Sequence, residues 1–270
     1  MPENLKKYFI TAALSLLPSI AQAETCSDAS NDFVNPERTQ TADSVNRVYV
    51  DPVYATEGNF TGRPLDGYSA KKVWIHPDAL EVLQEDTPAL QGRLKTHLMK
   101  AGMDERQATQ ESARFFYLIK DAYRPFRATT DMNRWRTKVN SDSDPSNNVG
   151  SGWIAGTVSN HNRGYTVDRT LVRKMDDGTF REVWMGSHFD EFNSNSYLMS
   201  EGGSSHIVGG RGHSSLDDKF AYGGSYFVVP QLSTSDLRKI LADAPGSDYW
   251  MEWWHTTIQS GGTCYDRPIQ

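Results

Sequence analysis

The stretch Ser159-Asn160-His161-Asn162-Arg163-Gly164-Tyr165-Thr166-Val167-Asp168 places an imidazole and a carboxylate seven residues apart, on either side of a glycine. A second such pair, Glu252 and His255, lies near the C-terminus and is separated by two tryptophans. Catalytic zinc usually takes three protein ligands from His, Asp or Glu and keeps a fourth position for water. We therefore expect His161, Asp168 and His255 to bind one zinc ion per chain.

Glu252 is the carboxylate that this ligand set leaves over. A carboxylate that stands beside the zinc-bound water without binding the metal can act as general base, and we expect Glu252 in that role. The alternative is that the two histidines are unrelated, because the chain has no His-Glu-x-x-His helix motif and distant histidines are usually unrelated. The residues alone leave both possibilities open.

The composition is typical of a soluble globular protein with a single domain. The chain has 270 residues and a net charge of -6, with 37% hydrophobic and 23% charged residues. Nucleic-acid binding needs clustered Lys and Arg, but this chain has more acidic residues (34) than basic residues (28). We therefore expect no nucleic-acid partner and no binding to acidic membranes.

The N-terminus has the pattern of a secretory signal peptide. Lys6 and Lys7 precede an apolar run over residues 8–20, and Ala21-Gln22-Ala23 provides small residues for cleavage. A membrane anchor is the alternative, but the run is shorter than the roughly 20 apolar residues of a spanning helix. We expect residues 1–23 to be removed, residues 24–46 to form a polar lead-in segment, and residues 47–270 to form one exported enzyme domain without a membrane span.

Export changes the interpretation of the two cysteines. Cys26 and Cys264 lie near the two ends of the mature chain, and chain ends are often close together in folded domains. In an oxidising compartment such a pair favours a disulfide over two free thiols. We expect Cys26 and Cys264 to be bonded.

Hydrophobic patterning and helix-end signals predict the main elements. We expect strands near residues 47–50, 115–119, 221–230 and 249–258, and helices over residues 77–103, 130–139 and 234–244, with Pro88 marking a break or a new helix start. On a regular strand Glu252 and His255 would face opposite sides, so their joint use requires a bend or bulge there.

Two further segments have functional potential. The strand at 115–119 runs into a turn that carries Arg124 beside a proline, and an arginine there can hold a carboxylate or an oxyanion, with a surface ion pair as the alternative. Residues 202–212 are rich in Gly and Ser and lack the ending of a phosphate-binding loop, which favours a mobile surface loop or lid. We do not expect His206 or His213 to bind metal.

Four segments, in order, resemble the D-Ala-D-Ala dipeptidase family of zinc peptidases, which includes the vancomycin-resistance dipeptidases. They comprise Tyr54-Ala55-Thr56 with Asn59-Phe60-Thr61-Gly62, then Asp121-Ala122-Tyr123-Arg124-Pro125, the stretch from Ser159 to Asp168, and Glu252-Trp253-Trp254-His255. The resemblance spans roughly residues 47–258. It implies a small α+β domain with a central, largely antiparallel sheet, flanking helices and zinc in the cleft.

The resemblance also implies a role for each matching residue. His161, Asp168 and His255 correspond to the zinc ligands, Glu252 to the general base and acid, and Arg124 to the group that stabilises the oxyanion. Asp190 corresponds to the carboxylate that faces the substrate ammonium, and Ser159 and Tyr54 are further substrate-contact candidates. The segment from 194 to 230 is longer and richer in glycine than this family leads us to expect.

The expected activity is hydrolysis of the small substrate D-Ala-D-Ala to two D-Ala by a zinc-bound water. Resistance dipeptidases act in the cytoplasm, so an exported relative is better suited to turnover of cell-wall peptides. A carboxypeptidase or endopeptidase that trims longer peptidoglycan peptides is one alternative. A non-enzymatic zinc-binding module is another, although a structural metal site needs neither Glu252 nor Arg124.

Overall fold

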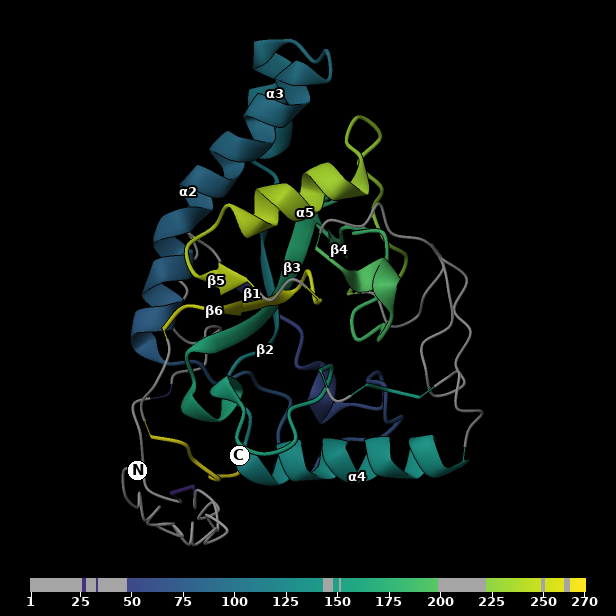
Figure 1. Cartoon of the computed structure of the whole chain (residues 1–270). Helices are drawn as coiled ribbons and strands as arrows, with labels where there is room; N and C mark the ends of the chain where they lie inside the picture. Colours follow the sequence, from purple (N-terminus) through teal and green to yellow (C-terminus); the bar gives the residue numbers. More distant parts are fainter. Residues whose placement is uncertain are drawn as a thin grey trace, which may run out of the picture.

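The computed structural model describes residues 26–27, 33, 48–142, 148–150, 152–198, 222–248, 251–259 and 263–270. Within these ranges the chain forms one open, mixed sheet with helices around it, which confirms the expected α+β class (Figure 1). The sheet order is β1-β2-β3-β6-β5, with β4 paired to β3. Only β1 and β2 run parallel to each other, and the remaining pairs are antiparallel.

The strands differ greatly in length, and the two longest form the centre of the sheet. Their bounds are β1 Val48–Val50, β2 Phe115–Asp121, β3 Thr166–Lys174, β4 Phe180–Glu182, β5 Ser247–Asp248 and β6 His255–Thr257. In β3 only the last residue is exposed, so both faces of this strand are covered. The opening sequence motif therefore ends inside the central strand of the sheet, which the patterning had not predicted as a strand.

The register of the central strands positions the candidate ligands. Asp168 of β3 lies opposite Asp121 of β2 on one side and opposite His255 of β6 on the other. Directly opposed residues of antiparallel strands have neighbouring side chains. The sheet thus brings together residues that are far apart in the sequence.

In the part of the chain that the structure describes, four α-helices surround the sheet: α2 Pro77–Lys100, α3 Glu105–Ser112, α4 Phe126–Asp142 and α5 Thr234–Ala242. In Figure 1, α2 and α5 lie near each other beside the sheet, and α4 lies at the opposite end of the molecule. The buried leucines of α2 recur at helical spacing, at positions 80, 83, 90, 94 and 98. Full burial of such side chains contributes about 1.5–3 kcal/mol each, so α2 is held mainly by its packing.

The predicted break at Pro88 is wrong, because α2 continues through this residue. A proline inside a helix removes one backbone hydrogen bond and crowds the preceding turn. Thr87 and Leu90 are both fully buried on the packed face, and the apolar contacts on both sides of Pro88 outweigh the local cost. Helices α4 and α5 occur where expected, although α4 begins directly after Pro125 and is longer than expected at both ends.

The strand expected over residues 221–230 is also wrong for the part that the structure describes, residues 222–230. There the chain makes one isolated parallel bridge, Val183 with Phe227, to the edge beside β4. Gly223 and Gly224 both adopt positive φ and interrupt an extended conformation. Of the strand expected over 249–258, the structure describes residues 251–258; within these, β6 is the strand and residues 251–254 form a turn that precedes it.

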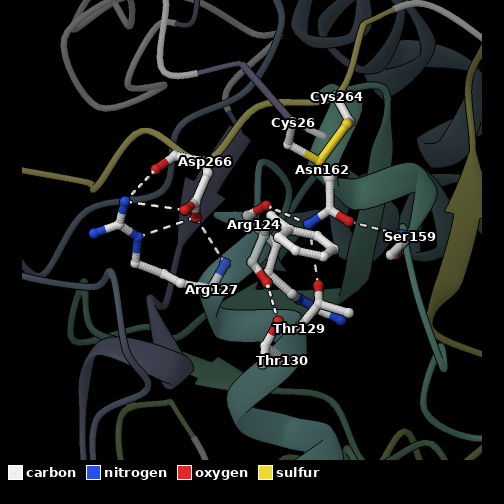
Figure 2. Close-up of a disulfide and its surroundings, with 10 residues drawn as sticks. Cys26, Arg124, Arg127, Thr129, Thr130, Ser159, Asn162, Cys264 and Asp266 are labelled. Carbon is white, nitrogen blue, oxygen red and sulfur yellow. Dashed lines mark hydrogen bonds and ion pairs between the residues drawn. A yellow bond between two sulfur atoms is a disulfide. The ribbon is translucent and has the colours of Figure 1, made fainter. Parts of the chain in front are cut away.

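The chain ends are joined as expected, because Cys26 and Cys264 form a disulfide (Figure 2). The C-terminal tail after Cys264 is bound to the body of the domain, since the backbone N–H of Ile269 donates to Gly67 O and that of Ser69 donates to Ile269 O. Residues 1–23, expected as a signal peptide, most of the expected lead-in segment, and residues 202–213 with His206 and His213 lie outside the described residues. Of the helices described, none combines the length and the apolar character needed to cross a membrane.

Candidate metal and catalytic site

Three residues with potential ligand atoms converge at one end of the central strands. Asp168 comes from β3, His255 begins β6, and His161 comes from the short 3-10 helix η3, Asn160–Arg163. One ligand atom from each of the three lies within 4.8 Å of the other two. The imidazole rings of His161 and His255 have their centroids 5.2 Å apart, in an edge-to-face arrangement.

Gly164 allows η3 to stand next to β3. It ends η3 in the left-handed conformation, at a φ of 81°, and its N–H donates to His161 O. A Cβ atom at this position would lie 2.1 Å from the ring of Phe33. The glycine between His161 and Asp168 is therefore required both by the backbone conformation and by the lack of space.

The orientation of His161 fits a metal ligand. Its Nδ1 lies 2.8 Å from Ala122 O, and a carbonyl only accepts, so Nδ1 carries the hydrogen and Nε2 keeps its lone pair. Nε2 lies 3.4 Å from Asp168 Oδ1. Both atoms are buried, and neither has a hydrogen-bond partner among the described residues. A cation bound between them would satisfy both, and a hydrogen bond from the second ring nitrogen is typical of metal-binding histidines.

The electrostatics favour the protonation states of Asp168 and His255 that metal binding needs. Burial opposes ionisation of Asp168, but His161 and Arg124 lower the pKa of its carboxyl to about 2. Burial lowers the pKa of His255 to about 3, against the opposing charge of Asp168. An ionised carboxylate and a neutral imidazole are the forms that bind metal.

Arg124 is buried beside this cluster, so the surface ion pair considered from the sequence is wrong. Its Nε donates to Asp121 Oδ2 at 2.8 Å, and its NH2 group donates to Asp168 Oδ2 at 3.0 Å. The guanidinium carbon lies 4.9 Å from the ring centroid of Tyr54, which is a cation–π distance. Asp121 had no role in the sequence interpretation, and only the register of β2 with β3 could have indicated one.

Glu252 lies in the turn before β6 and is 7% exposed. The turn is closed by a hydrogen bond from His255 N–H to Glu252 O, and both side chains line one cavity. The bend that the sequence required is therefore this turn rather than a bulge within a strand. Burial, together with the negative charges of Asp168 and Asp190, holds the pKa of Glu252 well above its usual value.

The two tryptophans between Glu252 and His255 anchor this turn. Both are almost fully buried. The indole N–H of Trp253 donates to Ser187 Oγ, and the carbonyl of Trp254 accepts from the backbone N–H of Arg169 in β3. Both tryptophans therefore pack in the core.

Asp190 faces the same cavity from the loop after Met185. It is the one non-glycine residue in the described ranges with a positive φ, 59°. Its Oδ1 accepts a 3.0 Å hydrogen bond from the hydroxyl of Tyr54, and its buried Oδ2 has no hydrogen-bond partner in the described ranges. Burial, with the added charge of Asp168, raises the pKa of Asp190 well above its usual value. Strained backbone conformations of this kind are concentrated at functional sites.

Ser159 lines the cavity, but its hydroxyl is also the N-cap of η3 and accepts from His161 N–H at 3.2 Å. The cavity has a volume of about 180 Å³. The polar residues that line it are Tyr54, Arg124, Ser159, His161, Asp168, Asp190, Glu252 and His255. Its apolar wall is formed mainly by Phe60, Met132, Trp153, Ile154, Phe192 and Trp254.

A second buried charge cluster supports the loop that carries Asp190, and the sequence interpretation missed it. Lys120, the residue before Asp121, donates from Nζ to Glu182 Oε2 at 2.6 Å and to Asp51 Oδ2 at 2.9 Å. Its ammonium lies 5.8 Å from the ring centroid of Phe189, the neighbour of Asp190. A lysine inside an otherwise apolar strand pattern is the only sequence signal that points to this cluster.

Comparison with known proteins gives consistent matches. The model of a peptidase M15 family described as D-Ala-D-Ala dipeptidase matches residues 82–270. A D-alanyl-D-alanine dipeptidase of Enterococcus faecium is 27% identical over 238 residues, covering 84% of this chain and 95% of that protein. Enzymes of the same name from Enterococcus faecalis and Streptomyces coelicolor are each 26% identical and cover 76% and 83% of this chain, and 83% and 94% of their own lengths.

Proposed function

This chain belongs to the peptidase M15 family of D-Ala-D-Ala dipeptidases, and we propose that it is a zinc-dependent dipeptidase that hydrolyses D-Ala-D-Ala to two molecules of D-alanine. The observation that carries this proposal is the convergence of three potential zinc ligands with a buried glutamate and a buried arginine on one small cavity. The enzymes that match over most of the chain are named for this activity.

His161, Asp168 and His255 are the residues that would hold the zinc. The unpartnered atoms His161 Nε2 and Asp168 Oδ1 and the neutral His255 support this ligand set. When bound, zinc lowers the pKa of a coordinated water and polarises the scissile carbonyl. Arg124 and Ala122 O orient Asp168 and His161 from behind, so that each presents one defined atom to the ion.

Glu252 would take the proton from the attacking water and return it to the leaving amine. A general base must accept a proton and release it again during one turnover, which is easiest when its pKa lies near the working pH. Burial raises the pKa of the Glu252 carboxyl, which moves it toward the working pH. Its place in the turn that also carries His255 keeps it at a constant position relative to the site.

Arg124 would stabilise the negative charge that develops on the carbonyl oxygen. The guanidinium has five N–H groups, and its hydrogen bonds to Asp121 and Asp168 use two of them. These bonds and the ring of Tyr54 hold the group in place before the reaction, and charge stabilisation by a preorganised donor is a large catalytic contribution.

Asp190 would bind the free ammonium of the dipeptide. Its Oδ2 is buried and lacks a hydrogen-bond partner among the described residues, and a cationic amine would both supply one and favour the ionised carboxylate. Tyr54 would keep Asp190 in position through its hydroxyl, and Ser159 would border the substrate while it caps η3.

The size of the cavity favours a dipeptide over longer peptides. A volume of about 180 Å³ lies below the roughly 300–1,000 Å³ of pockets for drug-sized ligands. A carboxypeptidase or endopeptidase would need room for the chain beyond the scissile bond. A purely structural zinc module would need neither a buried base nor an arginine beside the metal.

We also propose that the enzyme acts outside the cytoplasm, in turnover of wall-derived dipeptide, with residues 1–23 as signal peptide and residues 47–270 as the catalytic domain. The disulfide between Cys26 and Cys264 supports an oxidising compartment. Sequencing the N-terminus of the protein recovered from the periplasm or medium would test the cleavage after Ala23.

Kinetics on D-Ala-D-Ala and on its N-acetyl form test the activity and the substrate length together. If Asp190 binds the ammonium, acetylation leaves a buried carboxylate unpaired, at a cost of about 2–5 kcal/mol in transition-state binding. The unblocked dipeptide should therefore have much the higher kcat/KM. Asp190→Asn should lower kcat/KM for D-Ala-D-Ala and reduce the preference over the acetylated form.

Asp86→Asn is the matched control, because Asp86 is equally buried but pairs with Arg93 on α2, away from the cavity. This variant should keep the preference for the free amine. Equal kcat/KM for the two substrates in the wild-type enzyme would exclude the dipeptidase assignment and favour a carboxypeptidase.

A further inference from the structure

Asn162 follows the candidate ligand His161 in η3 and is completely buried. Its side chain does not line the cavity, so it has no direct role in the proposed chemistry. It nevertheless lies between the turn that carries Arg124 and the start of η3, beside the disulfide (Figure 2). A buried amide must be satisfied by hydrogen bonds, and the identity of the partners of Asn162 indicates what it holds.

The side-chain amide of Asn162 joins three segments. Its Nδ2 donates to Arg124 O at 2.7 Å and to Thr129 Oγ1 at 3.0 Å, and its Oδ1 accepts from the backbone N–H of Ser159 at 2.6 Å. Its backbone carbonyl accepts from Tyr265 N–H at 2.9 Å. The amide is therefore fully occupied in connecting η3 to the turn before α4.

Arg124 is held from both sides of its backbone by two consecutive residues. Its N–H donates to His161 O at 3.1 Å, and its carbonyl accepts from Asn162 Nδ2. No rotation of the Arg124 backbone is possible without breaking one of these two bonds. The position of the guanidinium relative to the imidazole of His161 thus depends on the Asn162 amide.

We propose that Asn162 is a positioning residue that holds the guanidinium of Arg124 in register with the metal-binding cluster. This inference rests on the proposed role of Arg124 in dipeptide hydrolysis. Misplacement of a catalytic group by about 1 Å can reduce the rate about 100-fold. Asn162→Ala should therefore lower kcat for D-Ala-D-Ala by about 10- to 100-fold, with KM and the content of one zinc per chain little changed.

A double-mutant cycle with Arg124 tests whether Asn162 acts through that residue. In an Arg124→Ala background, Asn162→Ala should change the residual kcat by less than about twofold, because the group that it positions is gone. An equal fold-loss of kcat in both backgrounds would overturn the proposal. So would loss of zinc from the single variant, because Asn162 would then act on His161 rather than on Arg124.

Two further variants separate positioning from folding. Asn162→Asp keeps the shape and the acceptor for Ser159 but replaces the donor to Arg124 O, so it should reproduce the loss of kcat even if the alanine variant fails to fold. Thr129→Val is the matched control, because it removes the other acceptor of the same Nδ2 group and leaves the bond to Arg124 intact. It should retain kcat within about threefold, and a loss as large as that of Asn162→Asp would contradict the proposal.

A readout without substrate distinguishes failure of this inference from failure of the proposed function. In the zinc-loaded protein, the ¹H–¹⁵N NMR signal of the Arg124 Nε–H reports its hydrogen bond to Asp121. We expect this signal to shift or broaden in Asn162→Asp and to stay unchanged in Thr129→Val. An unaltered signal in Asn162→Asp would reject the positioning role, whereas a wild-type protein inactive on D-Ala-D-Ala would reject only the dipeptidase function.

Discussion

At the scale of single residues, the candidate site contains several buried polar atoms that have no hydrogen-bond partner among the described residues. His161 Nε2, Asp168 Oδ1 and Asp190 Oδ2 all face one region and lack hydrogen bonds within the described part of the chain. Burying such atoms costs free energy, so their concentration at one cavity indicates ligands rather than chance. The first two face the proposed metal, and the third faces the proposed ammonium.

Removal of any one metal ligand should abolish stable zinc binding. We expect His161→Ala, Asp168→Ala and His255→Ala each to contain much less than one zinc per chain after dialysis, because each variant lacks one of only three protein ligands. Metal analysis of the purified variants measures this directly. His97→Ala is the control, since His97 lies on α2 with a quarter of its side chain exposed. Full zinc content in any of the three ligand variants would remove that residue from the set.

Glu252→Gln should separate metal binding from catalysis. The amide keeps the shape of the side chain but cannot accept the proton, so we expect full zinc content and a kcat lower by roughly 10²- to 10⁴-fold. Steady-state kinetics together with metal analysis provides the test. Undiminished turnover would show that another group is the base, and loss of zinc would show that Glu252 is itself a ligand.

At the scale of elements, a salt bridge joins the loop that follows Tyr54 to α4. Arg63 donates two hydrogen bonds to Asp131 of α4, and the backbone N–H of Asp66 donates to the same carboxylate. The hydrogen bonds from Arg63 are the main cause of the lowered pKa of Asp131. In the same loop the backbone N–H of Leu65 donates to Tyr54 O at 2.9 Å, and Tyr54 in turn contacts Arg124 and Asp190.

The contribution of Asp131 to stability should depend on pH in a defined direction. Its pKa is lower in the folded than in the unfolded state, where it is about 3.9, so the stabilisation is present above pH 4 and is lost as the pH falls through the folded-state value. Because Arg63 is about half exposed, we expect Asp131→Asn to cost only about 1 kcal/mol at pH 7.

Urea unfolding of wild type and Asp131→Asn from pH 7 downward measures this difference. The two free energies of unfolding should converge toward the acid end. Asp66→Asn is the control, because it removes an exposed side-chain charge from the same loop and keeps the backbone N–H that donates to Asp131, so it should be nearly neutral at every pH. A difference that stays constant with pH would mean that Asp131 acts through packing rather than through its charge.

At the scale of the whole molecule, the C-terminal tail is packed against the segments behind the site. Beyond the disulfide, Asp266 accepts from the backbone N–H and from Nε of Arg127 (Figure 2). The backbone N–H of Phe126 donates to Tyr265 O. The tail therefore binds the first turn of α4, directly after Arg124. The disulfide to Cys26 and the backbone hydrogen bonds of Ser27 with Cys264 and Asp266 bring residues 26–27 to the same place.

Removing the disulfide should destabilise the fold without removing the metal. The bond joins residues 238 positions apart, and closing a long loop restricts the unfolded chain strongly. We expect the Cys26→Ser, Cys264→Ser double variant to lose about 2–5 kcal/mol of unfolding free energy and to retain one zinc per chain. Denaturant unfolding with and without reductant provides the measurement. Reductant should lower the midpoint of the wild type alone, and identical midpoints for all four samples would refute a stabilising role.

The sequence by itself determined the set of candidate site residues and most of the helices. The sequence shows directly which side chains are imidazoles and carboxylates. The spacing of the leucines along α2 predicts burial on one face of the helix, and this spacing is a local property. The pairing of Cys26 with Cys264 followed from the expected export and from their positions near the two ends of the expected mature chain. The α+β class came from the ordered resemblance of four segments.

Only the tertiary structure decided how these parts meet. The β2–β3–β6 register sets Asp168 between Asp121 and His255, and no local pattern specifies which strands pair. Arg124 lies in a turn, and only the tertiary structure shows that its side chain is buried and held in one position. Helix α2 continues through Pro88 because the packing of the helix outweighs the low helix propensity of proline. The strand predicted over 221–230 does not form within the described residues 222–230. Gly223 and Gly224 adopt positive φ there, and the segment pairs with its neighbour through a single bridge. Local residue types thus determine which reactions are possible, whereas long-range pairing and burial determine where the reacting groups stand.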